Sequence, residues 1–141
     1  MTENVLKEQA ESLLTAYCAA VDGHHLDQLQ ALFTEDSTFF TRGTLMTAPE
    51  RDVFFRELWA ASDERSTHVC RDVRATRAGD TVTINALLTA TFILSDGSVR
   101  MAFGHYDDLA EMTAAGLRLK AKRVIVDRTE VVTAERVATP A

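Results

Sequence analysis

The stretch Thr81–Leu94, TVTINALLTATFIL, decides the fold because apolar and polar side chains alternate along it. Successive side chains of a β-strand point to opposite faces, so a repeat of two residues is typical of a strand with one face on a core. The apolar positions are Val82, Ile84, Ala86, Leu88, Ala90, Phe92 and Leu94. The sequence therefore predicts a long strand from Thr81 to Leu94.

Short turns separate this strand from its neighbours on both sides. The predicted turns are Ala78–Asp80, Ser95–Ser98 and Ala114–Gly116. The second of them contains Asp-Gly, a pair favoured in β-hairpins. The segments between the turns predict three further strands, over Thr67–Arg77, Val99–Glu111 and Leu117 to about Val132.

The N-terminal half predicts helices, because its apolar residues recur at steps of three and four. The first helix is expected from about Asn4 to Val21, with one apolar stripe made of Leu6, Ala10, Leu13, Leu14, Tyr17 and Val21. Asp22-Gly23 predicts its end, since glycine tolerates the left-handed exit from a helix. A shorter helix is predicted from His25 to Phe33.

Two more elements are predicted before the first long strand. Ser37–Thr41 predicts a small strand. Thr47-Ala48-Pro49-Glu50 has the pattern of a capping box with proline in the first turn, which predicts a third helix to about Ala60. Helices followed by a meander of antiparallel strands predict the α+β class, with the helices on one face of the sheet.

The other face of this sheet is expected to need cover, because the strands carry apolar residues at both parities. Leu87 and Ile93 stand at the opposite parity to Leu88 and Leu94. An exposed apolar sheet face is commonly buried against a second copy of the same chain. The sequence therefore predicts a homodimer.

The composition fits one domain over residues 1–141, with a loose tail over about 134–141. Lys and Arg number 15 and Asp and Glu number 21, and the net charge of −6 argues against a nucleic acid or an anionic membrane as partner. No apolar run reaches the roughly 18–20 residues that span a membrane, and Met1–Asn4 lacks the features of a secretory signal. Two cysteines are too few for a disulfide scaffold, so we expect a protein of the reducing cytoplasm.

Several short motifs follow one another along the chain: Tyr17–Asp22, Leu26–Asp27, Leu32–Asp36, Thr67–Val69, Gly104–Asp108 and Leu117–Leu119. In this order they resemble the NTF2-like superfamily, specifically its SnoaL-like branch, over nearly the whole chain. The resemblance implies an NTF2-like (cystatin-like) cone, in which N-terminal helices pack on a curved antiparallel sheet around a ligand pocket.

Members of this superfamily differ in function, because a fold does not determine chemistry. They include dehydratases, isomerases and polyketide cyclases, and also the small (β) subunits of ring-hydroxylating dioxygenases, to which Leu117–Arg123 and the tail to Pro140 are particularly similar. The resemblance therefore leaves two classes open. One is a cofactor-independent lyase or isomerase acting on a small hydrophobic, polyketide-, terpenoid- or steroid-like molecule. The other is a non-catalytic module that binds a ligand or a large oxygenase subunit.

Asp22 and His68 are the first candidates for catalysis, because one ends the first helix and the other opens the first long strand. A carboxylate hydrogen-bonded to one imidazole nitrogen fixes the tautomer and raises the basicity of the other nitrogen. The resemblance implies the same role, since the matching aspartate and histidine are catalytic in the superfamily's dehydratases. The alternative is that Asp22 caps the next helix and His68 is a structural strand residue.

Tyr17 is the third candidate, because it precedes Asp22 by five residues and lies about 140° from it around the helix. It would act as a proton donor or oxyanion stabiliser, or else fill the core. His105 and Tyr106 fall on opposite faces of a strand, so at most one of them faces the pocket. The predicted pocket residues are Phe40, Phe54, Trp59, Met101, Phe103, His105 and Tyr106.

Other charged and polar groups are expected to be structural or solvated. His24-His25 predicts a solvated turn, and Arg118, Lys120 and Lys122 predict a solvated or dimer-facing stripe. The sequence has no Gly-rich phosphate loop and no zinc motif, so neither a cofactor nor a metal is expected. Cys18 shares a helix face with Asp22 and Cys70 a strand face with His68, which predicts two buried thiols close together.

Overall fold

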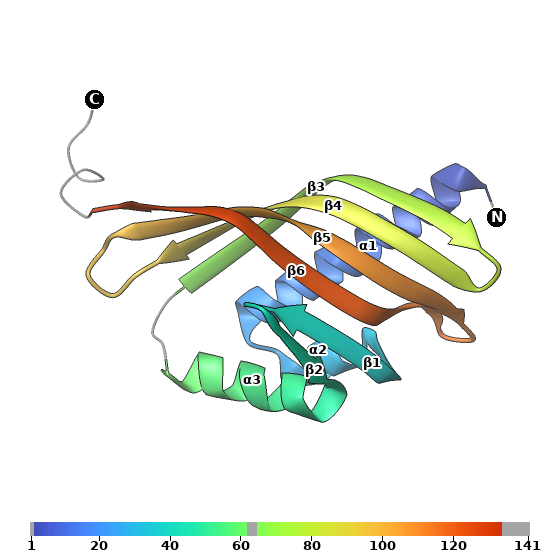
Figure 1. Ribbon diagram of the computed structural model, residues 1–141, viewed down its shortest axis with the longest axis horizontal. Helices are drawn as coiled ribbons and strands as arrows, with labels where there is room; N and C mark the ends of the chain where they lie inside the picture. Colours follow the sequence, from blue (N-terminus) through green and yellow to red (C-terminus); the bar gives the residue numbers. More distant parts are fainter. Residues whose placement is uncertain (1, 62–64, 134–141) are drawn as a thin grey trace.

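The computed structural model describes residues 2–61 and 65–133 (Figure 1). The tail expected over 134–141 lies outside these residues. Helices and strands follow one another along the described chain as α1 (Glu3–Gly23), α2 (Leu26–Gln30), β1 (Phe33–Thr41), β2 (Thr44–Thr47), α3 (Ala48–Ala61), β3 (Arg65–Ala78), β4 (Thr81–Ile93), β5 (Val99–Thr113) and β6 (Gly116–Val132).

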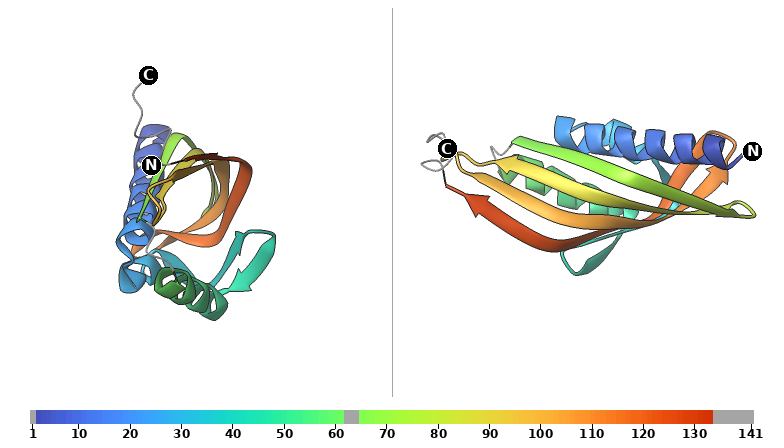
Figure 2. Two further views of the ribbon diagram at one scale, coloured as in Figure 1. Left: turned by 90° about the vertical axis from the view of Figure 1, so that its left-hand side faces the viewer. Right: turned by 90° about the horizontal axis from the view of Figure 1, so that it is seen from above.

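The strands form one six-stranded sheet in the order β2-β1-β6-β5-β4-β3. Neighbours from β3 to β6 are antiparallel, and β1 pairs parallel with β6. Figure 2 shows that the sheet curls strongly, with α1 running antiparallel along β3 and α3 lying across the open side. The α+β class predicted from the sequence is confirmed.

Helix α1 begins and ends at residues that cap it. The Thr2 hydroxyl accepts a hydrogen bond from the backbone N–H of Val5, and the left-handed residue at the other end is His24, with φ 57°. The prediction that glycine makes the left-handed exit is therefore wrong by one residue. A Cβ on Gly23 would lie 2.5 Å from Cδ2 of the exposed His25 side chain.

The capping box predicted at Thr47–Glu50 is present at the start of α3. The backbone N–H of Thr47 donates to Oε1 of Glu50 at 3.0 Å, and the N–H of Glu50 donates to Oγ1 of Thr47 at 3.4 Å. The predicted second helix is shorter than expected, because Phe33 already begins β1. The sequence analysis also missed β2, which a two-residue turn joins to β1.

Two irregularities in the pairing of β5 with β6 change which side chains face inward. The register slips between Leu109 and Ala110, so that Lys120 is an extra residue in β6. Such a bulge reverses the alternation of side chains. Lys122 therefore points inward and is fully buried, and the prediction of a solvated stripe is wrong for this lysine.

The second slip lies between Phe103 and Gly104 and makes Asp127 the extra residue. Here the backbones of β5 and β6 come so close that a Cβ on Gly104 would overlap the carbonyl oxygen of Ile125. Between the two bulges, Val124 and Val126 face the concave side of the sheet, where they line the cavity described below.

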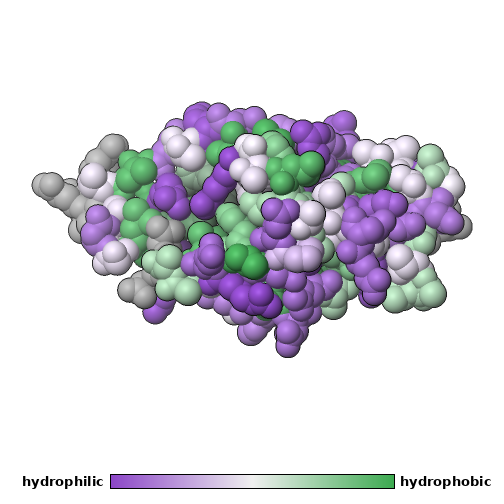
Figure 3. All heavy atoms as spheres, turned by 60° about the horizontal axis from the view of Figure 1, so that its bottom comes forward, coloured by the Kyte–Doolittle hydropathy of each residue, from purple (hydrophilic) through white to green (hydrophobic). Residues whose placement is uncertain are grey.

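The core lies between the concave face of the sheet and the helices. All the inward residues predicted on β4 from Val82 to Ala90 are buried, whereas Leu87, Ile93 and Val69 on the convex face are exposed. Figure 3 shows the side of the molecule that carries α3, where apolar patches (green) alternate with hydrophilic residues (purple).

Candidate active site

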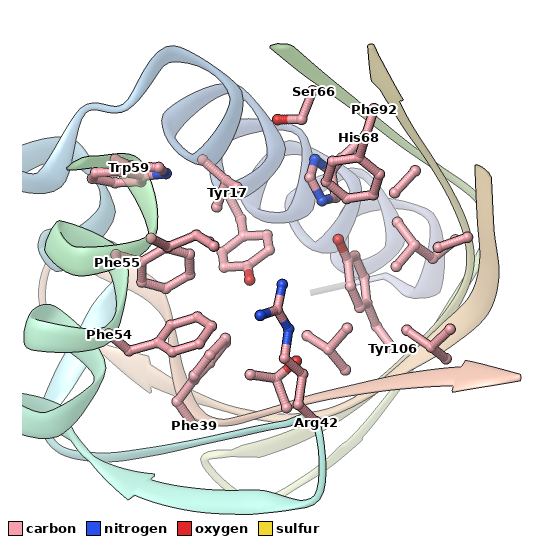
Figure 4. A pocket seen from close by; sticks show the side chains of 18 of the residues that line it. Tyr17, Phe39, Arg42, Phe54, Phe55, Trp59, Ser66, His68, Phe92 and Tyr106 are labelled. Atoms are coloured by element: carbon pink, nitrogen blue, oxygen red, sulfur yellow. The ribbon is translucent and has the colours of Figure 1, made fainter. Parts of the chain in front are cut away.

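An open cavity with a volume of about 150 Å³ lies inside the curl of the sheet (Figure 4). One wall is aromatic and comes from β1 and α3: Phe39, Phe54, Phe55 and Trp59. The opposite wall is aliphatic and comes from β4, β5 and β6: Leu88, Ala90, Ala102, Val124 and Val126. The few polar groups that face this space therefore stand in mostly apolar surroundings.

Asp22 and His68 meet at one end of the cavity, where the last turn of α1 packs on β3. Oδ1 of Asp22 lies 2.6 Å from Nδ1 of His68. Its other oxygen, Oδ2, accepts the backbone N–H of His68 at 2.8 Å, and Ser66 Oγ donates to Oδ1 at 2.8 Å. Helix α2 has no side-chain cap, so the alternative that Asp22 caps it is wrong.

These contacts determine the protonation of the pair. Burial raises the pKa of Asp22, but the hydrogen bonds from the His68 ring, the His68 backbone and Ser66 outweigh burial and hold that pKa below its usual value. Because an ionised carboxylate only accepts hydrogen bonds, Nδ1 of His68 must carry a proton. In the neutral form of the ring the lone pair is then on Nε2, which has no hydrogen-bond partner within residues 2–61 and 65–133.

Tyr17 and Tyr106 stand edge to face beside this histidine, with ring centroids 5.7 Å apart. Figure 4 shows the hydroxyl of Tyr106 directed toward His68 and that of Tyr17 directed into the cavity. Burial is the largest cause that raises the pKa of both hydroxyls well above 10. Both tyrosines therefore stay protonated and are suited to donate hydrogen bonds to a ligand.

A buried ion pair lies behind the two tyrosine rings. Nζ of Lys122 is 2.7 Å from Oδ2 of Asp108, and both side chains are fully buried. The same ammonium lies 3.1 Å from the centroid of the Tyr106 ring and 4.4 Å from that of Tyr17. The ammonium thus packs against both rings. Burial lowers the pKa of Lys122 and raises the pKa of Asp108.

Of the predicted pocket residues, Phe54, Trp59 and Tyr106 line the cavity. Phe40, Met101, Phe103 and His105 do not, which corrects their expected placement. Phe39 occupies the wall instead of Phe40, because neighbours in β1 point to opposite faces. The other three alternate with Ala102 and Tyr106 in β5 and so lie on the convex face, where His105 pairs with Asp127 at 3.1 Å.

The sequence analysis missed several groups that line the cavity. His24, expected in a solvated turn, stacks on Trp59 with centroids 5.1 Å apart and planes inclined by 14°. Arg42 and Arg100 also reach the cavity, from the β1–β2 turn and from β5. The one signal in the sequence was that Arg42 and Arg100 lie within a few residues of Thr41 and Phe103. That position does not show whether a side chain faces the cavity or the solvent.

Cys18 and Cys70 are free thiols close enough to shift each other's pKa, as their positions beside Asp22 and His68 predict. Cys18 is buried and also lies 3.8 Å from the Tyr106 hydroxyl, whereas Cys70 is only partly buried. The hydrogen bond from Cys18 is the largest cause that lowers the pKa of Cys70, to about 7.

Neither a metal site nor a membrane-spanning helix is found in the described part of the chain. No three His, Cys, Asp or Glu side chains in residues 2–61 and 65–133 come together as metal ligands. Within the same residues, no helix is both long and apolar enough to cross a bilayer.

Comparison with known proteins gives one family and many similar folds. The model of the SnoaL-like domain family matches residues 6–123. None of the curated proteins matches the chain.

Three solved structures illustrate the similarity. A type 2 hexachlorocyclohexane dehydrochlorinase has a TM-score of 0.82 and 12% identity, with coverage of 98% of this chain and 97% of that chain. A candidate scytalone dehydratase from Novosphingobium aromaticivorans has a TM-score of 0.79 and 15% identity, with coverage of 99% and 98%.

The third structure, from the same organism, is the β subunit of a candidate aromatic-ring-hydroxylating dioxygenase. It has a TM-score of 0.71 and 19% identity, with coverage of 89% of this chain and 91% of that chain. At these identities the likeness concerns the fold alone. It confirms the NTF2-like, cystatin-like cone that the sequence predicts.

Proposed function

The chain belongs to the SnoaL-like domain family, and from this premise we propose that it is a cofactor-independent lyase or isomerase of the dehydratase or cyclase type. The observation that carries the proposal is the Asp22–His68 pair, whose free Nε2 lies at the end of an apolar cavity. The aromatic and aliphatic walls favour a small hydrophobic substrate. The likeness to a candidate scytalone dehydratase and to a dehydrochlorinase supports this class.

The proposed reaction is a proton transfer with His68 as the base. In a dehydration, Nε2 takes a proton from the carbon next to the one that bears the hydroxyl group. The C–H electron pair becomes the new C=C bond, the C–O bond breaks, and the departing hydroxide leaves as water with the proton that His68 had accepted. Asp22 is a positioning residue that stabilises the intermediate imidazolium.

Tyr17 and Tyr106 act in this proposal as hydrogen-bond donors. Their hydroxyls stay protonated, so each is able to bind a carbonyl or leaving oxygen as negative charge develops on it. In an isomerisation or cyclisation the same base takes a proton beside a carbonyl group, and the tyrosines stabilise the enolate oxygen.

The test is a screen of small hydroxylated carbonyl compounds for loss of one water molecule, followed by mass spectrometry. We expect His68→Ala to lower turnover by about 10²–10⁴-fold while circular dichroism shows an intact fold. Asp22→Asn is expected to move the pH profile of turnover as well as its maximum, which a purely structural role would not do. Equal turnover in wild type and His68→Ala would refute the proposal.

A second candidate function is the small subunit of a ring-hydroxylating dioxygenase, which the likeness to such a β subunit favours. In that case the chain would bind a large oxygenase subunit and need no base in the cavity. The two functions are separated by assaying the purified chain alone. The enzyme proposal predicts turnover without any partner, whereas a subunit shows none and forms a complex with an added large subunit.

We also propose that the convex face of the sheet is covered by a second copy of the chain. Val69, Leu87 and Ile93 are exposed there, with 55%, 41% and 51% of their surface accessible. A homodimer measured by light scattering, and its loss in Leu87→Glu, would support this assembly. A monomer at micromolar concentration would contradict it.

The two free cysteines fit a reducing compartment such as the cytoplasm.

A further inference from the structure

Arg42 occupies an unusual backbone position at the mouth of the cavity. It and Gly43 form the two-residue turn between β1 and β2, with φ of 53° and 77°. A turn with both angles positive favours Asn, Asp or Gly, because a larger side chain is disfavoured in the left-handed region. An arginine kept in this conformation points to a role for its side chain.

The guanidinium of Arg42 is directed into the cavity, where Figure 4 shows it between the aromatic wall and the two tyrosines. Its Cζ lies 5.6 Å from the centroid of the Phe54 ring. No Asp or Glu of residues 2–61 and 65–133 forms an ion pair with it, since each described ion pair joins other groups. The charge is therefore available to a ligand.

Arg42 brings a positive charge to the cavity although the chain as a whole has a net charge of −6. No Asp or Glu stands among the described residues that line the cavity. Asp22, which lies beside His68 at the end of the cavity, accepts hydrogen bonds from His68 and Ser66. A lining of this kind selects against cations and in favour of an anionic group beside an apolar body.

The size of the cavity suits a small apolar body. Its volume of about 150 Å³ matches that of an engineered apolar cavity known to bind benzene. The aromatic rings of Phe39, Phe54 and Trp59 offer faces on which a flat ring packs. A guanidinium binds a carboxylate through two parallel hydrogen bonds, which fixes the orientation of the bound molecule.

We infer that the substrate is a single-ring carboxylate and that Arg42 binds its carboxylate group at the mouth of the cavity. The inference rests on the proposed function and specifies its substrate class. Arg42 is in this account a specificity-determining residue: it holds the acidic end of the molecule, while the ring enters the cavity toward His68 and the tyrosines. Neutral molecules of the same shape bind less tightly.

The probes are benzoate and benzamide, which share ring and shape but differ in charge. Binding is measured by NMR titration at pH 8. Wild type is expected to bind benzoate at least about tenfold more tightly than benzamide, the range of a hydrogen-bonded charge. In Arg42→Gln this preference disappears and benzamide binding is unchanged.

Two further variants keep the test decisive. Arg56→Gln removes an exposed arginine of α3 outside the cavity lining and should leave the benzoate preference intact. Arg42→Asn suits the left-handed turn, so it should raise the melting temperature and yet abolish the preference, which excludes misfolding as the cause. Equal binding of both probes by wild type, or a preference that survives in Arg42→Asn, would overturn the inference.

The result is independent of catalysis, because binding of benzoate requires no proton transfer. If His68→Ala proved fully active while the Arg42-dependent preference held, the proposed function would fail and the anionic ligand class would stand. If wild type showed His68-dependent turnover but no preference for benzoate, the proposed function would stand and the anionic ligand class would fail.

Discussion

Two histidine–aspartate pairs lie within residues 2–61 and 65–133, one on each face of the same sheet. In the cavity, His68 and Asp22 are 2.6 Å apart, with 14% and 22% of their side chains exposed. On the convex face, His105 and Asp127 are 3.1 Å apart, with 41% and 59% exposed. The carboxylate in the cavity has two further hydrogen bonds, from Ser66 and a backbone N–H, whereas the structure gives the outer pair one contact.

Residue types alone therefore do not make a candidate active site. An exposed ion pair is screened by water and contributes about 0–1 kcal/mol. A partly buried carboxylate with three hydrogen bonds fixes one tautomer of its histidine and leaves the second nitrogen facing an apolar space. The following substitutions test this contrast, each with the outer or exposed group as its control.

The largest expected effect is on turnover. Once a substrate is identified, His68→Gln should lower kcat by about 10²–10⁴-fold, because the base is lost. His105→Gln should leave kcat within about twofold, because its ring lies on the far face of the sheet. Steady-state kinetics of both variants checks this, and a comparable loss in the two would remove the distinction between the pairs.

The next largest effect is expected on the free energy of unfolding, and it compares the buried Lys122 with the exposed Lys120. Lys122→Met leaves Asp108 as an uncompensated buried charge, which typically costs about 3–5 kcal/mol of unfolding free energy. Lys120→Met removes an ammonium that lies 3.8 Å from Asp36 and is 42% exposed, and the expected change is within about 0.5 kcal/mol. Urea denaturation of both variants measures the difference, and equal midpoints would contradict the burial of Lys122.

A smaller effect is expected for Asp22, and it depends on pH. Its pKa in the folded state is below the unfolded value, so its stabilisation is present above the ordinary carboxyl pKa and is lost as the pH falls through the lower folded value. Asp22→Asn should therefore cost about 1–3 kcal/mol near pH 7 and progressively less below about pH 4. A cost that grows toward acid pH would contradict the lowered pKa of Asp22 in the folded state.

The smallest effect is expected for the outer aspartate. Asp127→Asn removes an exposed partner of His105 and should change the unfolding free energy by less than about 1 kcal/mol. Thermal denaturation of this variant beside Asp22→Asn gives the comparison directly. A loss in Asp127→Asn as large as that in Asp22→Asn would contradict the contrast between the two pairs.

Much of the fold could be predicted from the sequence, because the decisive signals are local. The alternation in β4, the apolar stripe of α1 and the capping box at Thr47 and Glu50 each depend on residues close together in the chain. The Asp22–His68 contact was also within reach, since it follows from one helix end and one strand start in a recognisable order.

The errors have a common physical cause in the backbone. Bulges at Lys120 and Asp127 arise from pairing between β5 and β6, and no local pattern marks them. The bulge at Lys120 turned Lys122 inward against the expectation of a solvated stripe. The side chain of Arg42 enters the cavity because Arg42 and Gly43 form a left-handed turn. The glycine suggests a turn in the sequence, but it does not show to which side of the sheet the arginine side chain points.

The proposed mechanism requires that Asp22 holds His68 with Nε2 unprotonated and open to the cavity. It is tested most directly by long-range ¹H–¹⁵N NMR of the histidine rings at pH 8, assigned with a His68→Gln variant. We predict that His68 carries its proton on Nδ1 in wild type and that this preference is lost in Asp22→Asn. A His68 ring protonated on Nε2 in the wild-type protein would contradict the account.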